Sequence, residues 1–124
     1  MSIALESEGF VVNGSLVRNL LEGGPDSSHE EIFETLLTFR GRVRIERILS
    51  RGECSPEGFW YDQPQSEWVV VLRGSPQIRL EGEEGVRELK PGDSLLLLPH
   101  VRHRVEWTDP ESLTIWLAVH FDSE

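Results

Sequence analysis

Residues 89–105 read LKPGDSLLLLPHVRHRV, and the prediction of the fold begins from this stretch. Pro91 and Gly92 mark a turn, four leucines follow, and Pro99 interrupts the apolar run. Beyond Pro99, apolar and charged residues alternate with the two-residue period of a β-strand. The apolar side of that strand comprises Val101, His103, Val105 and Trp107. The pattern therefore predicts an ionisable histidine among inward-pointing side chains.

The leucine run, residues 95–98, has no polar side to present to water. A short apolar run of this kind indicates a strand that is covered on both faces. The turn, the doubly covered strand, the break and the inward histidine together predict a β-barrel or β-sandwich with a site at its mouth.

Length and charge limit the class of partner. The chain has 124 residues and a formal charge of −10, from 22 acidic and 12 basic residues. This length predicts one domain with one core, and the negative charge argues against binding nucleic acid phosphates. No apolar run approaches the roughly 20 residues of a membrane span, and the first ten residues lack the pattern of a secretory signal. Because Cys54 is the only cysteine, no intrachain disulfide is expected. We expect a cytoplasmic protein without membrane or nucleic acid partners.

Residues 29–39 have the spacing of an amphipathic helix. Ser28 and Glu31 fit a capping box, in which each side chain satisfies a backbone N–H of the first turn. Gly41 stands where a helix of this length would end. The apolar stripe at helical spacing comprises Ile32, Phe33, Leu36, Leu37 and Phe39. We predict one α-helix over 29–39, lying against the outside of a sheet.

From Arg42 onward the chain reads as short strands and turns. Strand patterns cover residues 43–49, 67–72, 77–80, 86–89 and 113–119. Residues 82–85 fit a hairpin turn, and the last strand is apolar on both faces, which predicts a central position. Seven or eight strands at this spacing predict an all-β fold. We divide the single domain into an N-terminal segment, 1–41, with a short strand and the helix, and a β-barrel, 42–120.

Two stretches resemble the two motifs of the cupin superfamily. Glu67 and Gly74 match the end of the first motif, and the second motif is matched by Pro91, Gly92, Asp93, Pro99 and His103. The resemblance covers about residues 43–119. It implies a cupin double-stranded β-helix, or jelly-roll barrel, with the N-terminal helix packed outside.

Metal-binding cupins hold iron, manganese, nickel or zinc with three histidines and a carboxylate, and the resemblance gives two of these roles to Glu67 and His103. The two other histidine places are taken here by one of two pairs, Trp60 with Asp62 or Tyr61 with Gln63. The first pair would complete a metal set of Asp62, Glu67 and His103. This mixed oxygen and nitrogen set suits one divalent ion, Zn, Mn or Fe.

The alternative to a metal site is a polar pair. A buried carboxylate is costly unless it is paired, so Glu67 could pair with His103 or with an arginine inside the barrel. With or without an ion, we expect these two residues in a ligand pocket. The predicted pocket residues are Trp60, Tyr61, Gln63, Glu67 and His103.

Three functions follow from these patterns. The leading one is a small-molecule-binding cupin of undefined reaction, with a weak divalent metal site. The second is a metal-dependent isomerase, dioxygenase or lyase of small molecules, in which Tyr61 or His100 would move protons. The third is a structural or regulatory interaction domain. Cupins commonly form dimers, so the resemblance also implies a homodimer that covers exposed strand edges.

Overall fold

The computed structural model describes residues 3–5, 10–12, 15–17, 19–23, 31–39 and 42–122. These residues form antiparallel β-strands and turns, and no helix among them could cross a membrane. The strands are β1 (Ile3–Leu5), β2 (Phe10–Val12), β3 (Ser15–Val17), β4 (Ile32–Phe39), β5 (Val43–Ser50), β6 (Ser66–Arg73), β7 (Gln77–Leu80), β8 (Arg87–Glu88), β9 (Ser94–Leu97), β10 (His103–Trp107) and β11 (Thr114–Phe121).

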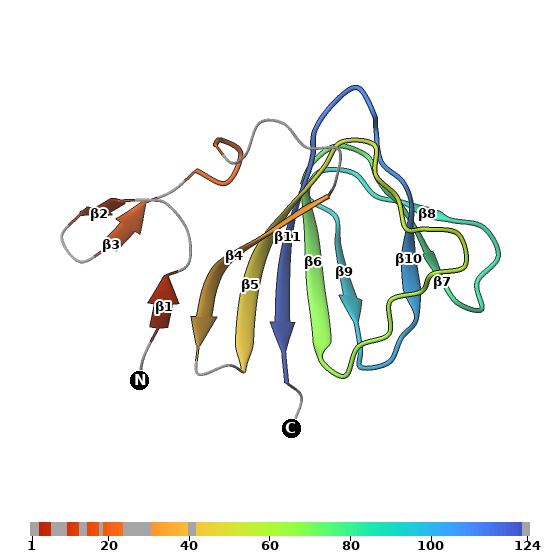
Figure 1. Cartoon of the computed structure of the whole chain (residues 1–124), viewed down its shortest axis with the longest axis horizontal. Coiled ribbons are helices and arrows are strands. Elements are labelled where there is room, and N and C mark those ends of the chain that lie inside the picture. The colour runs from red at the N-terminus through yellow and green to blue at the C-terminus, as the bar shows by residue number, and fades with distance from the viewer. Residues whose placement is uncertain are drawn as a thin grey trace.

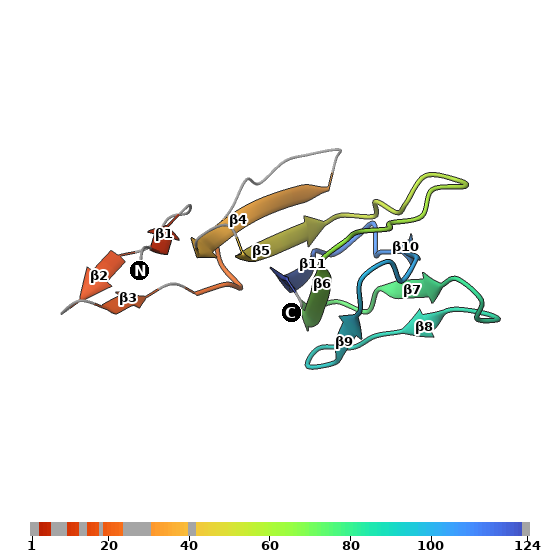
Figure 2. The same ribbon diagram turned by 90° about the horizontal axis from the view of Figure 1, so that it is seen from below.

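The strands form a large sheet and a small one. The large sheet has the order β1-β4-β5-β11-β6-β9, the small sheet has the order β10-β7-β8, and β2 pairs with β3 alone. Figures 1 and 2 show the small sheet beside the β6–β9 end of the large sheet, where it folds round to form the second wall of the barrel. The predicted cupin jelly roll is therefore confirmed.

Strand β11 lies at the centre of the large sheet, as its apolar sequence predicts. It pairs along its length with β5 on one side and with β6 on the other. Because side chains alternate across a strand, every second residue of these three strands points toward the small sheet. The buried core between that inner face and the small sheet comprises Ile48, Val69, Val71, Ile78, Leu89, Trp116 and Ala118.

The helix predicted over residues 29–39 is wrong for residues 32–39, which form strand β4. Residues 29 and 30 lie outside the described part of the chain. Strand β4 pairs with the edge of β5, and its β-branched and aromatic residues favour that state. A register shift between Thr35 and Leu37 interrupts the alternation, and Leu36 in the shift is buried. This bulge produces an apolar spacing that resembles a helical stripe.

The prediction that the leucine run is covered on both faces is also wrong. Strand β9 is the edge of the large sheet. Leu97 is 3% exposed and faces the core, whereas Leu96 and Leu98 are 52% and 57% exposed. Apolar residues on both sides of a strand therefore do not establish that both sides are covered here.

Other features of the barrel agree with the sequence patterns. Strands β7 and β8 form the hairpin predicted around residues 82–85. In the N-terminal segment, β1 pairs with β4 and so belongs to the large sheet. On the outer face of that sheet, the buried guanidinium of Arg47 donates to the carbonyls of Leu20 and Glu22 and pairs with Glu34. The division of the chain at residue 42 stays a prediction.

Candidate ligand cavity

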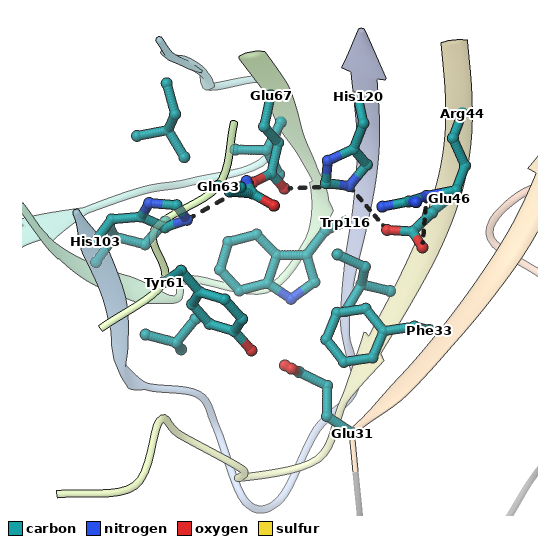
Figure 3. Close-up of a pocket in the computed structure, with 15 residues that line it drawn as sticks. Glu31, Phe33, Arg44, Glu46, Tyr61, Gln63, Glu67, His103, Trp116 and His120 are labelled. Carbon is teal, nitrogen blue, oxygen red and sulfur yellow. Dashed lines mark hydrogen bonds and ion pairs between the residues drawn. The ribbon is translucent and has the colours of Figure 1, made fainter. Parts of the chain in front are cut away.

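A cavity of about 220 Å³ opens on the inner face of the large sheet, between it and the small sheet. Its position follows from strand alternation, since the residues that line it from one strand are two or four apart. Figure 3 shows these side chains converging from β4, β5, β6, β11 and the segment before β6. The polar and charged lining residues are Glu31, Arg44, Glu46, Tyr61, Gln63, Glu67, His103 and His120.

The side chains of Glu67 and His103 meet in this cavity. Glu67 Oε1 lies 3.6 Å from His103 Nε2, and both side chains are about nine-tenths buried. The other ring nitrogen, Nδ1, lies 2.9 Å from the carbonyl oxygen of Val101. Because a carbonyl only accepts hydrogen bonds, Nδ1 carries a proton. His103 therefore presents Nε2 to the carboxylate, either as a basic lone pair or, when a second proton is bound, as a donor.

Tyr61 and Gln63 surround this pair. The backbones of Tyr61 and His103 exchange two hydrogen bonds, of 2.7 and 3.1 Å, and their rings stack with centroids 5.4 Å apart. The amide of Gln63 donates to Glu67 Oε1 at 2.7 Å. Of the two pairs that the sequence left open, Tyr61 and Gln63 are the one that faces the cavity.

Trp60 and Asp62 do not line the cavity. The ring of Trp60 lies 5.9 Å from the guanidinium carbons of both Arg102 and Arg104. Asp62 Oδ1 lies 2.8 Å from Nδ1 of His100, and both side chains are largely exposed. His100 has φ +64°, so it occupies the left-handed region. Thus the structure brings Tyr61, Gln63, Glu67 and His103 together and leaves the remaining two predicted residues outside.

Sequence reasoning missed His120 and Glu46. His120 Nε2 lies 2.9 Å from Glu46 Oε1 and 3.9 Å from Glu67 Oε2. Arg44 Nε in turn lies 3.3 Å from the other oxygen of Glu46. The alternation along β11 carried the signal, because His120 lies four residues beyond the inward-facing Trp116.

A second polar group lies at the Glu31 end of the cavity. Ser50 Oγ donates to Glu31 Oε2 at 2.6 Å and accepts from the indole N–H of Trp116 at 3.1 Å. Figure 3 shows the Glu31 carboxylate and the Tyr61 hydroxyl pointing toward one another. In the sequence Glu31 fits a helix cap, so it was not among the predicted site residues.

The pKa shifts differ between the two ends. Burial raises the pKa of Glu31. The hydrogen bond from Ser50 acts to lower this pKa, and the negative charge of Glu53 acts to raise it. Burial and the charges of Glu31 and Glu67 raise the pKa of Tyr61, so its phenol remains a hydrogen-bond donor at neutral pH. Burial also acts to raise the pKa of Glu67, but His103, His120 and Gln63 together outweigh it and lower that pKa. These contacts therefore favour the ionised form of Glu67.

The metal set predicted from the sequence does not assemble among the described residues. Asp62 pairs with His100 outside the cavity, and the described residues contain no group of three His, Cys, Asp or Glu that could hold an ion. Glu67 and His103 supply one oxygen and one nitrogen, fewer donors than the three protein ligands of catalytic zinc sites. These two donors by themselves do not fit a tightly held ion.

These features define a small β-barrel protein with a ligand-sized internal cavity. A family model described as "Cupin domain" matches residues 48–120, and this chain belongs to the cupin family. No curated protein matches the chain.

Solved structures agree with this assignment. A Ralstonia eutropha JMP134 protein, provisionally described as a mannose-6-phosphate isomerase, is 48% identical over 86% of this chain and 98% of its own, with a TM-score of 0.81. An RmlC-like cupin from Shewanella frigidimarina NCIMB 400 is 20% identical over 80% and 82%, with a TM-score of 0.62. A cupin superfamily protein from Desulfitobacterium hafniense DCB-2 is 16% identical over 80% and 84%, with a TM-score of 0.64. At 20% and 16% identity, the Shewanella and Desulfitobacterium proteins show only that the fold is shared.

Proposed function

We propose that this cupin binds a small polar organic molecule in its barrel cavity and uses Glu67 and His103 to hold or move a proton on it. The observation that carries the proposal is the approach of Glu67 Oε1 and His103 Nε2, 3.6 Å apart, inside a cavity. A carboxylate and an imidazole at this separation can both hydrogen bond to one ligand group that approaches them from the cavity, and can exchange a proton with it.

The size of the cavity limits the ligand. Its volume of about 220 Å³ is below the roughly 300–1,000 Å³ of sites for drug-sized molecules. Val69, Ile78 and Leu97 line it beside the polar groups. A compact ligand with both apolar and hydrogen-bonding parts fits this lining.

Thermal unfolding in the presence of sugars, keto acids, aromatic acids and amines tests the proposal. A compound that binds the cavity, at a free concentration of 100 times its Kd, would raise the free energy of unfolding by about 2.7 kcal/mol. We expect Glu67→Gln and His103→Ala to abolish that increase. Glu57→Gln and His100→Ala are the matched controls, because both positions lie outside the cavity.

The result that opposes the proposal is equal ligand stabilisation in the cavity variants and the controls. A ligand would then bind elsewhere, and the Glu67–His103 pair would be structural. If no compound stabilises the wild-type protein, the interaction-domain function gains support. The oligomeric state measured by light scattering would then be the next observation, since a homodimer is predicted from the sequence.

A second candidate is a metal-dependent enzyme, an isomerase in particular. The observation that favours it is the 48% identity to the Ralstonia protein provisionally described as a mannose-6-phosphate isomerase. Metal analysis of protein purified without chelator or affinity tag tests this candidate. A stoichiometric Zn, Mn or Fe ion that disappears in Glu67→Gln and His103→Ala would support it, and ion-free protein that still binds a ligand would count against it.

A further inference from the structure

The charges in the cavity are balanced at one end and unbalanced at the other. Glu46 has a cation or an imidazole on each oxygen, at 3.3 Å from Arg44 and 2.9 Å from His120. Glu67 has the Gln63 amide and the His103 imidazole. Within the described part of the chain, the Glu31 carboxylate pairs with no cationic side chain, and its hydrogen-bond donor is the Ser50 hydroxyl.

Aromatic rings surround this carboxylate. The Ser50 hydroxyl accepts a hydrogen bond from the indole N–H of Trp116 and donates one to Glu31, which holds the indole beside the carboxylate. Figure 3 shows the rings of Tyr61 and Phe33 on the two sides of the space into which Glu31 points. Phe33 lines the cavity although half of it is exposed. An aromatic face attracts a cation through its π electrons, so rings and acid favour the same kind of ligand group.

We propose that the ligand carries an ammonium group, which binds between the Glu31 carboxylate and the faces of Tyr61, Trp116 and Phe33. This inference rests on the proposed small-molecule binding and assigns the ligand to the class of organic amines. The charge of −10 on the whole chain acts in the same direction, because it attracts cations and repels phosphates. The Arg44 guanidinium lies beside Glu46, with Nε 3.3 Å from its carboxylate, so this positive charge is compensated within the cavity.

The same balance argues against a phosphorylated ligand at the Glu31 end. A phosphate placed there would lie beside an uncompensated carboxylate. The cavity contains one arginine against three glutamates. We therefore expect inorganic phosphate to show no affinity for the cavity.

The test compares two probes of the same shape, choline and its uncharged isostere 3,3-dimethyl-1-butanol. Binding is followed by the NMR shift of the Trp116 indole N–H, at a fixed salt concentration of about 0.15 M. We expect choline to bind the wild-type protein about tenfold more tightly, as cation–π attraction and a carboxylate together allow. In Glu31→Gln the preference should fall to the part that the aromatic rings alone provide, whereas Glu57→Gln keeps the full preference despite the same loss of one negative charge.

A second variant keeps the test independent of Glu31. Tyr61→Leu removes one aromatic face, and we expect it to weaken choline binding more than binding of the alcohol. Equal affinity of the two probes for the wild-type protein, a preference that is undiminished in Glu31→Gln, or no shift with choline would each overturn the inference. Alcohol binding without a preference for choline would leave the proposed small-molecule binding intact. No cavity shift with any compound of the wider panel would contradict both.

Discussion

The imidazole of His103 stacks on the ring of Tyr61 with a centroid distance of 5.4 Å and an interplanar angle of 21°. The two backbones also exchange hydrogen bonds, which join the segment before β6 to the edge of β10. The ring and the backbone of Tyr61 therefore hold His103 in place, together with the carbonyl of Val101. An imidazole held in this way meets Glu67 in one orientation, which a proton-sharing pair requires.

The Glu67–His103 pair should show energetic coupling. His103→Ala leaves a buried carboxylate without its imidazole, so we expect a loss of about 2–4 kcal/mol in the free energy of unfolding. Glu67→Gln keeps the shape and should cost less. Urea denaturation of both single variants and the double variant gives the interaction energy, expected at about 1–3 kcal/mol. Strictly additive losses would show that the two side chains do not interact.

Gly74, the glycine of the first cupin motif, is predicted to be intolerant of any side chain. Its φ is +96°, and an added Cβ would lie 2.6 Å from Thr114 Oγ1 and 3.1 Å from Thr114 Cα. We expect Gly74→Ala to destabilise the protein by about 2–4 kcal/mol. Gly58→Ala is the control: φ is +78° there but the space is open, so only the backbone cost of about 1–2 kcal/mol should appear. Similar melting temperatures for the two variants would refute the contribution of the contact with Thr114.

Arg47 links β5 to residues 20–22 on the outer face of the large sheet. Its guanidinium is fully buried, donates to the carbonyls of Leu20 and Glu22, and lies 2.9 Å from Glu34 Oε2. We expect Arg47→Ala to cost about 3–5 kcal/mol, because it removes a fully buried guanidinium together with its ion pair to Glu34 and its hydrogen bonds to two carbonyls. Hydrogen exchange should also become faster at residues 19–23. Unchanged exchange there would mean that other contacts hold this segment.

Glu31→Gln should stabilise the protein at neutral pH. The pKa of Glu31 is raised in the folded state, so the folded protein binds its proton more tightly than the unfolded chain does. As pH rises through the folded pKa, an ionised carboxylate must stay buried, and stability falls. The variant removes that cost, so its melting temperature should exceed the wild-type value at pH 7. The difference should vanish below pH 4.5, the usual pKa of this group, where both states are protonated.

A constant difference between pH 4 and pH 8 would contradict this assignment. The expected result also fits the proposed ammonium site, since binding groups are often retained at a cost in stability. Added choline should then reduce the stability advantage of the variant.

Much of the barrel could be predicted from local patterns. The alternation beyond Pro99 placed His103 inward, and the spacing of Glu67 and Gly74 matched a cupin motif. Strands β5, β6, β7 and β11 appear where that alternation indicates them. The helix over 29–39 was wrong because a bulge in a strand and a helical stripe give similar apolar spacing over eight residues.

The charged partners of the site could not be predicted in the same way. Glu46 and His120 lie in β5 and β11, and Glu31 directly precedes β4. These segments share no motif, and the three residues line one cavity because β4, β5 and β11 pair side by side. A shift of one residue would turn each of these side chains to the outer face.

By itself, the sequence determined that the chain forms a cupin barrel and that one acid and one histidine face its interior. Periodicity and turn residues are local, and they specify strands and their two faces. The tertiary structure alone decided that Tyr61 and Gln63, not Trp60 and Asp62, complete the cavity, and that Glu31 has no cationic partner among the described residues. Those outcomes depend on register and on long-range pairing, because they are set by which face of each strand meets the opposite sheet.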